Sequence, residues 1–319
     1  MRKTATYQKI NTLYKRYKNL GKVELPNKQW IKFQNKIILG DFSDDYMAYI
    51  KDLKFDCFSK IDGTNTKIAY FPSTGECFCG GKTDNADIVG NGLKNHVDAI
   101  IERIKPTLAE LFSPESARFT PVLNDKNQVQ YYLPDIVEIS NPMPGFKTAK
   151  GDAVTNVPCG GTYMVDLEEV PVYIYGEFYG KGIQKCGVNY GEKRFTVFDI
   201  CQQGWWVPID MLNSYCEKLG LEVAPYLGQM TIDEAEKMVM DGFKTKVPGA
   251  ANPDLIEEGI VARPVVPIKD PRGNRIIVKI KYCDYHELRT AINEIGGDIE
   301  FAKFDKWYKE NQNMIENIK

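Results

Sequence analysis

Short apolar runs recur along the chain between turn residues, and this pattern predicts β-strands. The first run ends at a Lys-Ile-Asp-Gly turn, and the next one reads as the strand that returns from it. The expected strands are Phe55–Lys60, Thr66–Phe71, Cys77–Lys82, Val172–Phe178, Phe195–Ile200, Ile260–Arg263 and Arg275–Lys281.

Other stretches carry apolar residues at helical spacing. This spacing predicts a helix over residues 92–112, and start signals such as Thr-x-x-Glu predict two more over 208–219 and 231–242. A short helix is expected over residues 7–18, and the chain from Asp284 onward is expected to be helical. Many strands alternating with a few helices favour an α+β fold, in which mixed sheets are covered by helices.

Strand periodicity also places two lysines together. In Val278-Lys279-Ile280-Lys281 the alternation puts Lys279 and Lys281 on one face of a strand whose other face is apolar. Two converging ammonium groups can neutralise a phosphate. A half-buried strand with a solvated basic face explains the same pattern equally well.

Size and composition describe an ordinary globular protein. The 319 residues suffice for one large domain or for one domain with an appendage, and 43% are hydrophobic and 26% charged. No apolar run approaches the ~20 residues that span a bilayer, and the first residues lack the apolar core of a secretory signal. Eight scattered cysteines without a C-x-x-C pair indicate reduced thiols and a cytoplasmic protein. Only two histidines are present, which leaves little room for a histidine-based mechanism.

The net charge of −2 hides a basic N-terminal segment. Residues 1–36 contain ten Lys and Arg against the single acid Glu24, and tyrosines, Trp30 and Phe33 are interleaved with them. Such a mixture can contact phosphates and stack on bases. A solvated basic face whose aromatics pack on the main body is an equally good interpretation.

The segment Lys60-Ile61-Asp62-Gly63 contains the strongest candidate for a nucleophile. A lysine attacks phosphorus only as the neutral amine, so its pKa must fall below the reference value of ~10.4 through burial or neighbouring cations. It then forms a covalent phosphoramidate and divides a difficult transfer into two easier ones. The four residues alone are weak evidence, because Asp-Gly is an ordinary turn signal.

Further segments supply what such an intermediate needs, although each also has a plain structural explanation. Glu177 lies between Gly176 and the strand end and can accept hydrogen bonds from a ribose, while Phe198 can stack on a purine. Glu258, directly before a strand, suits Mg²⁺ bound by oxygen ligands. Lys82 follows a strand within reach of a ribose or phosphate.

These segments occur in an order that resembles the covalent nucleotidyltransferases, the superfamily of ATP-dependent ligases and mRNA capping enzymes. Within it the chain is most similar to RNA ligase domain proteins of phages and bacteria, related to the second RNA ligase of phage T4. The resemblance covers about residues 5–290. It rests on Lys60–Gly63, Tyr175–Glu177, Val197–Ile200, Glu258–Val261 and Val278–Lys281, and on Tyr7–Leu13, Gly80–Asn85, Gly180–Lys185 and Ala262–Pro264.

The resemblance implies a ligase adenylation fold, with two mixed or antiparallel sheets, flanking helices and a nucleotide groove between the sheets. It implies a reaction in three steps. Lys60 takes AMP from ATP in the presence of Mg²⁺ or Mn²⁺, and the AMP then passes to a 5′-phosphate end. A 3′-hydroxyl finally displaces the AMP and seals the strand. Ile61 would line the adenine pocket and Phe198 would stack on adenine. The other implied contacts are Asn65 and Lys82 to the nucleotide, Glu177 to the ribose, Glu258 to the metal, and Lys279 and Lys281 to the α-phosphate.

Some departures from the family pattern keep alternatives open. Lys82 stands where Arg is usual, and residues 113–170 read as an insertion in an adenylation domain spanning 51–283. The flanking parts would be a basic segment (1–50) and a helical tail (284–319), and that tail is too short for the OB-fold domain of DNA ligases. We therefore expect an ATP-dependent ligase that acts in RNA repair. Its substrate would be RNA ends, and DNA ends or a mixed duplex are the other substrates that the resemblance allows. The protein would be cytoplasmic, in a host cell if phage-encoded, and monomeric. A minimal DNA ligase and a non-catalytic binder of nucleotides or nucleic-acid ends are the alternatives.

Overall fold

The computed structural model describes most of the chain and divides it into two compact units. Unit 1 comprises Met1–Gln8 and Asp62–Ala224, and unit 2 comprises Lys9–Ile61 and Pro225–Lys319. Each unit is described separately. The described residues are 7–16, 23–24, 30–31, 35–72, 74–81, 93–112, 119–123, 129–134, 146–147, 164–165, 171–202, 205–271 and 273–296.

Unit 1 is built on a sheet in the order β15-β14-β13-β7-β8, with β16 added beside β14. All neighbours on the main path run antiparallel, and β16 alone pairs in parallel. The strands are β7 (Thr64–Phe71), β8 (Glu76–Gly80), β13 (Val172–Tyr179), β14 (Arg194–Gln202), β15 (Trp205–Trp206) and β16 (Glu222–Val223). The strands predicted here from apolar runs are confirmed, although Lys82 lies outside the described residues.

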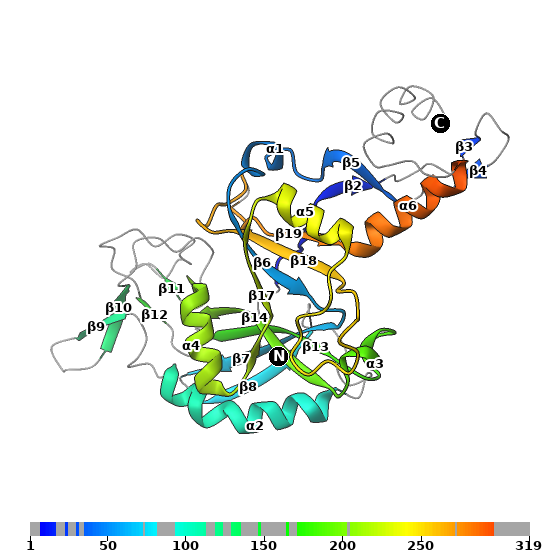
Figure 1. The fold of residues 1–319 in the computed structure, drawn as a ribbon. Coiled ribbons are helices and arrows are strands. Elements are labelled where there is room, and N and C mark those ends of the chain that lie inside the picture. The colour runs from blue at the N-terminus through cyan, green and yellow to red at the C-terminus, as the bar shows by residue number, and fades with distance from the viewer. Residues whose placement is uncertain are drawn as a thin grey trace. The chain divides into compact units, whose positions relative to one another are not determined.

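Helices α2 (Lys94–Leu111) and α4 (Ile209–Leu219) cover one face of this sheet (Figure 1), and the short α3 (Gly187–Tyr190) follows β13. The apolar stripe of α2 packs into a core with alternate residues of the strands, as its helical spacing predicts. Core residues include Ile68, Val97, Ile104, Leu108, Ile174, Val197 and Leu212.

The region 113–170, predicted to be an insertion, contains two short antiparallel ladders in its described residues. Strand β9 (Phe119–Leu123) pairs with β10 (Val129–Pro134), and β11 (Phe146–Lys147) pairs with β12 (Met164–Val165). These strands were missed from the sequence. The rest of this region lies outside the described residues, so the predicted insertion stays a prediction, as do the domain boundaries.

Unit 2 is built on a sheet in the order β1-β19-β18-β6-β17. Its strands are β1 (Asn11–Thr12), β6 (Phe55–Lys60), β17 (Tyr226–Met230), β18 (Gly259–Pro264) and β19 (Val278–Lys281). Only β1 pairs in parallel. Two further ladders join β2 (Tyr14–Arg16) to β5 (Ile37–Phe42) and β3 (Val23–Glu24) to β4 (Trp30–Ile31).

One face of this second sheet packs against α5 (Ile232–Asp241) and α6 (Tyr282–Gly296), and α1 (Met47–Ile50) adds Met47 to the same core. Helix α5 begins with the predicted capping box, in which the Thr231 side chain and Glu234 satisfy each other's backbone N–H groups. The core includes Phe55, Cys57, Ile232, Val239, Ile260, Val278, Ile280 and Leu288.

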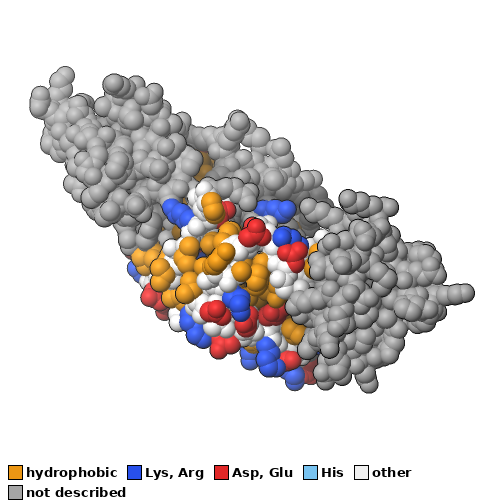
Figure 2. Space-filling view, turned by 90° about the horizontal axis from the view of Figure 1, so that it is seen from above, with side chains coloured by type: hydrophobic (Ala, Val, Ile, Leu, Met, Phe, Trp, Pro, Cys, Tyr) orange, Lys and Arg blue, Asp and Glu red, His pale blue; other side chains and the backbone are white. Residues whose placement is uncertain are grey.

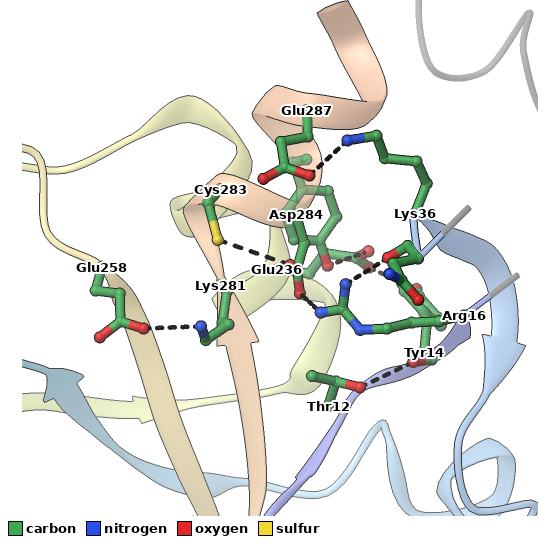
Figure 3. A network of polar contacts seen from close by, with 12 residues as sticks. Thr12, Tyr14, Arg16, Lys36, Glu236, Glu258, Lys281, Cys283, Asp284 and Glu287 are labelled. Carbon is green, nitrogen blue, oxygen red and sulfur yellow. Dashed lines mark hydrogen bonds and ion pairs between the residues drawn. The ribbon is translucent and has the colours of Figure 1, made fainter. Parts of the chain in front are cut away.

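The helix predicted over residues 7–18 is wrong, because the described part of this segment forms strands. Asn11 and Thr12 pair with β19, and the Leu13 N–H donates to the Lys279 carbonyl at 3.1 Å. Tyr14 is buried, and its hydroxyl donates to Glu236 of α5 at 2.9 Å (Figure 3). Pairing with an existing sheet edge outweighed the local helical spacing.

The two described units bear out the α+β fold class predicted from the sequence. None of the described helices is long and apolar enough to cross a membrane. On the face shown in Figure 2, acidic and basic side chains are interspersed around exposed hydrophobic ones. That mixture agrees with a net charge close to zero.

Candidate active site

The sheet of unit 2 brings three candidate residues to the same end of neighbouring strands. Lys60 is the last residue of β6, and Lys281 is the last residue of β19. Both pair in register with Gly259, the first residue of the central strand β18. Lys60 and Glu258 are 198 residues apart in the sequence. The sheet therefore brings distant segments together at the same end of these strands.

Glu258 joins the two lysines through one carboxylate. The Lys60 Nζ donates to its Oε2 at 2.5 Å, and the Lys281 Nζ donates to its Oε1 at 2.9 Å (Figure 3 shows the second contact). The exposed fractions are 20% for Lys60, 17% for Glu258 and 26% for Lys281, so solvent screens these ion pairs only in part.

Gly259 makes this arrangement possible. Strict strand alternation would put Glu258 on the same side as Ile260, which lies in the core. Gly259 instead has a φ of +152°, and a Cβ at this position would lie 1.9 Å from the Ile280 carbonyl oxygen. A residue without a side chain is required here, and the turn that it permits brings the Glu258 carboxylate to the lysine face.

The predicted alternation of β19 is confirmed. Val278 and Ile280 lie in the core, whereas Lys279 and Lys281 are both partly exposed. Lys279 pairs in register with Val261 on one side and with Thr12 on the other, so it lies one alternate position away from Lys281. The two lysines share the face that also holds Lys60.

The charge of Lys281 is fixed by its surroundings. Burial lowers its pKa, but the negative charge and hydrogen bond of Glu258 outweigh this effect, so the pKa of Lys281 is raised above the ordinary value of 10.5. Lys281 is therefore a permanent cation at neutral pH and can act as an anion-binding group.

In unit 1, the sheet places Glu177 and Asn65 side by side as register partners on β13 and β7. The Asn65 Oδ1 atom is buried and has no hydrogen-bond partner among the described residues. An unpaired buried acceptor is costly, which indicates a place for a ligand donor. A Cβ on Gly63 would lie 2.8 Å from Glu177 Cγ and 2.4 Å from the Phe178 carbonyl oxygen, so this turn also requires glycine.

Phe198 lies at a bulge in β14. The register passes from Tyr175↔Asp199 to Gly176↔Val197, which leaves Phe198 unpaired and partly exposed. Bulges of this kind re-aim a side chain. The Tyr7 ring packs against Phe198 at 5.1 Å between centroids, and its hydroxyl donates to Asp199 at 2.6 Å.

The comparison with protein-family models identifies the family of this chain. Residues 55–281, more than half of the chain, match the model of the RNA ligase family. This chain belongs to the RNA ligase family. The matched range contains every site residue that we predicted, from Lys60 to Lys281.

Solved RNA ligases resemble this family member only distantly. A ligand-free Naegleria gruberi RNA ligase variant is 12% identical, with a TM-score of 0.43, over 77% of this chain and 54% of that one. A variant of the same enzyme with ATP and Mn is 12% identical, with a TM-score of 0.44, over 87% of this chain and 63% of that one. An archaeal ATP-dependent RNA ligase is 14% identical, with a TM-score of 0.37, over 76% of this chain and 46% of that one. The chain thus spans about half the length of these ligases, and its family assignment rests on the family model.

The donor set of this ligase family member limits how a metal can be held. No group of three or more His, Cys, Asp or Glu side chains in the described part of the chain could bind a metal. Glu258 is the carboxylate that contacts both lysines. Such a donor fits Mg²⁺, which commonly uses one or two carboxylates together with water and substrate phosphates.

The remaining predicted residues divide between the described and undescribed parts of the RNA ligase segment. Ile61 follows β6 and is buried, with 4% exposure. Lys82 lies outside the described residues. Sequence reasoning missed the steric need for Gly63 and Gly259, and the contact of Tyr7 with Phe198. The Asp-Gly and Glu-Gly pairs were the available signals for the two glycines.

Proposed function

We propose that this protein is an ATP-dependent RNA ligase that joins a 5′-phosphate end to a 3′-hydroxyl end through a lysine-AMP intermediate on Lys60. One observation carries the proposal: within the RNA ligase segment, Lys60 lies 2.5 Å from Glu258, whose other oxygen binds Lys281. A nucleophile, a carboxylate and a fixed cation are thereby gathered on one face of a sheet.

Lys60 performs the first step. Its ammonium group has no lone pair, so a proton must leave before the amine attacks, and the Glu258 carboxylate is placed to accept it. The amine nitrogen then bonds to the α-phosphorus of ATP while the bond to pyrophosphate breaks. Lys281 and Lys279 bind the α-phosphate and stabilise the charge that develops on its oxygens.

The other predicted residues bind the nucleoside. Glu177 accepts hydrogen bonds from the ribose, and Asn65 offers the unpaired Oδ1 to a donor of the nucleotide. Phe198 presents a partly exposed ring for stacking on adenine, and Ile61 and Lys82 add an apolar wall and a second cation. In the later steps AMP passes from Lys60 to the 5′-phosphate, and the 3′-hydroxyl displaces it.

Glu258 also supplies the carboxylate for a divalent metal, Mg²⁺ or Mn²⁺. Such an ion would supply positive charge that stabilises the triphosphate and the departing pyrophosphate. Lys60 and Lys281 each contact one oxygen of Glu258, which leaves a lone pair on each oxygen that could bind the ion.

The test is the intact mass of the protein after incubation with ATP and Mg²⁺. The protein is first treated with pyrophosphate to remove AMP that is already attached. We expect an AMP adduct in the wild type and none in Lys60→Ala. Lys54→Ala is the matched control, because Lys54 is another lysine of unit 2 in an ion pair, with Glu234 at 2.8 Å, and it should keep the adduct.

The second arm supplies RNA ends that are already adenylated. Because Lys60 only makes the adenylate, Lys60→Ala should still seal these ends. A wild type without an adduct would favour the non-catalytic binder, and a GMP adduct would favour a capping enzyme. ATP-dependent sealing that persists in Lys60→Ala would refute the proposal.

Matched nicked duplexes test the choice of RNA as substrate. We expect faster joining when the strand that provides the 3′-hydroxyl is RNA, and preference for an all-DNA nick would favour the DNA ligase alternative. We further propose that the protein is cytoplasmic. The seven described cysteines support this location, because each has a free thiol.

A further inference from the structure

Tyr226 is an exposed aromatic residue on the same sheet face as Lys60. It is the first residue of β17 and pairs in register with Phe58 of β6, two positions before Lys60. The two rings lie 5.4 Å apart between centroids, so they are on the same face. At ~3.4 Å per residue, Tyr226 lies about 7 Å along the strand direction from the level of Lys60. Its exposed fraction is 48%.

The backbone aims this ring away from the core. The register between β17 and β6 shifts between Tyr226 and Gly228, which marks a bulge. Leu227 packs against the core of unit 2, whereas Tyr226 does not. Gly228 takes a φ of +104°, which a side chain would strain. Bulges commonly re-aim a side chain beside a functional site.

The hydroxyl of Tyr226 is held in place. It donates to the Asp56 carboxylate at 2.9 Å, and Asp56 also accepts from Gln229 at 3.3 Å. Asp56 is buried, with 8% exposure. Partial burial and this hydrogen bond raise the pKa of Tyr226 to about 12, so the phenol remains a neutral donor. The ring is therefore fixed before any ligand arrives, which reduces the entropy lost on binding.

Two cations lie on the same sheet face as the ring, Arg263 beside the neighbouring Phe58 and Lys279 farther across the sheet. The Arg263 guanidinium lies 4.8 Å from the centre of the Phe58 ring, beside Tyr226. Lys279 pairs with Val261, Val261 pairs with Phe58, and Phe58 pairs with Tyr226, so Lys279 lies in the same row across the sheet. Basic groups that follow a phosphate backbone, combined with an aromatic ring for a base, are the usual means of binding a single strand.

We propose that Tyr226 stacks on a base at the RNA end that is to be joined. The proposal rests on the ligase function above and deepens it by assigning a residue to the strand rather than to ATP. Phe198 of unit 1 already serves adenine in that scheme. Tyr226 therefore contributes to the sealing steps and leaves the adenylation of Lys60 unaffected.

The experiment compares Tyr226→Ala, Tyr226→Phe and the wild type in two assays. The first is formation of the AMP adduct with ATP and Mg²⁺. The second is sealing of pre-adenylated RNA at several RNA concentrations. For Tyr226→Ala we expect a normal adduct and a KM for RNA raised about tenfold, the size expected for one lost base stack. Tyr226→Phe keeps the ring and should stay within about threefold of the wild type.

Tyr49→Ala is the matched control, because Tyr49 is another exposed tyrosine of unit 2, at 86% exposure, in α1. It should leave both assays unchanged. Circular dichroism melting checks that each variant is folded. An unchanged KM in folded Tyr226→Ala, or a loss of adduct equal to the loss of sealing, would overturn the proposal.

A third measurement keeps the two proposals separable. RNA with 2-aminopurine at its end is titrated with each protein, since stacking on tyrosine quenches this fluorescence. If the wild type forms no adduct, the ligase function fails, yet weaker quenching by Tyr226→Ala would still support stacking. Equal quenching by the wild type and Tyr226→Ala would refute it.

Discussion

Replacing Gly259 by alanine should damage the fold and the candidate active site together. Gly259 has a φ of +152°, and an alanine Cβ would meet the Ile280 carbonyl oxygen at 1.9 Å and the Lys281 Cα at 2.9 Å. Both are backbone atoms of the neighbouring strand, so no side-chain rotation relieves the contact. Strand β18 must move away from β19, and Glu258 moves with it.

The size of the effect follows from two contributions. A non-glycine residue at such a φ costs on the order of 1–3 kcal/mol. Separating β18 from β19 at their paired ends loses one or two hydrogen bonds, at about 1 kcal/mol each. We expect a destabilisation of about 3 kcal/mol. For a unit of this size it lowers the melting temperature by about 6–12 °C.

Thermal unfolding followed by circular dichroism measures the stability, and intact mass measures the rate of AMP adduct formation. Gly40→Ala is the matched control: Gly40 also has a positive φ, of +78°, but no atom lies within 4 Å of its Cβ position. It should cost only about 1 kcal/mol for the backbone conformation and leave the adduct rate unchanged.

The reasoning would be refuted if Gly259→Ala melted at the temperature of Gly40→Ala and formed the adduct at the wild-type rate. A variant that is destabilised but forms the adduct normally would separate the two roles. It would show that Glu258 reaches the lysines without the turn at Gly259.

Three further predictions concern stability. Thr231→Ala removes the hydroxyl that caps α5 and should cost about 1 kcal/mol in urea unfolding; no loss would show that the cap is redundant. Leu212→Ala empties a fully buried position and should cost about 2–5 kcal/mol, whereas a loss below 1 kcal/mol would contradict the packing. Glu236 accepts hydrogen bonds from Tyr14 and Tyr285, and burial raises its pKa above 4.5. Its stabilising contribution is therefore complete below pH 4.5 and lost as the pH rises through the raised value. The melting temperature of Glu236→Gln relative to wild type should rise from pH 4 to pH 7, and a constant difference would contradict this.

Two local features of the structure could be predicted from sequence patterns. The alternation in β19 correctly placed Lys279 and Lys281 on one face, because the apolar Val278 and Ile280 must face the core. The Thr-x-x-Glu signal correctly marked the start of α5. Both inferences succeeded because the forces that decide them act within a few residues.

Other features depend on partners that are distant in sequence. The segment that includes Asn11 and Thr12 has helical spacing, yet an edge of the unit 2 sheet was available and made it a strand. The exposed position of Tyr226 follows from a bulge against β6, and no local pattern announces such a bulge.

The sequence by itself determined the α+β class, seven of the strands, the four longest described helices, and the identity of the chemical groups in the RNA ligase segment. Apolar periodicity and motif order carry that information. Only the tertiary structure decided that Glu258 joins Lys60 to Lys281. That contact depends on the register of three strands and on a glycine turn that reverses the expected direction of one side chain, and register is set by packing across the whole sheet.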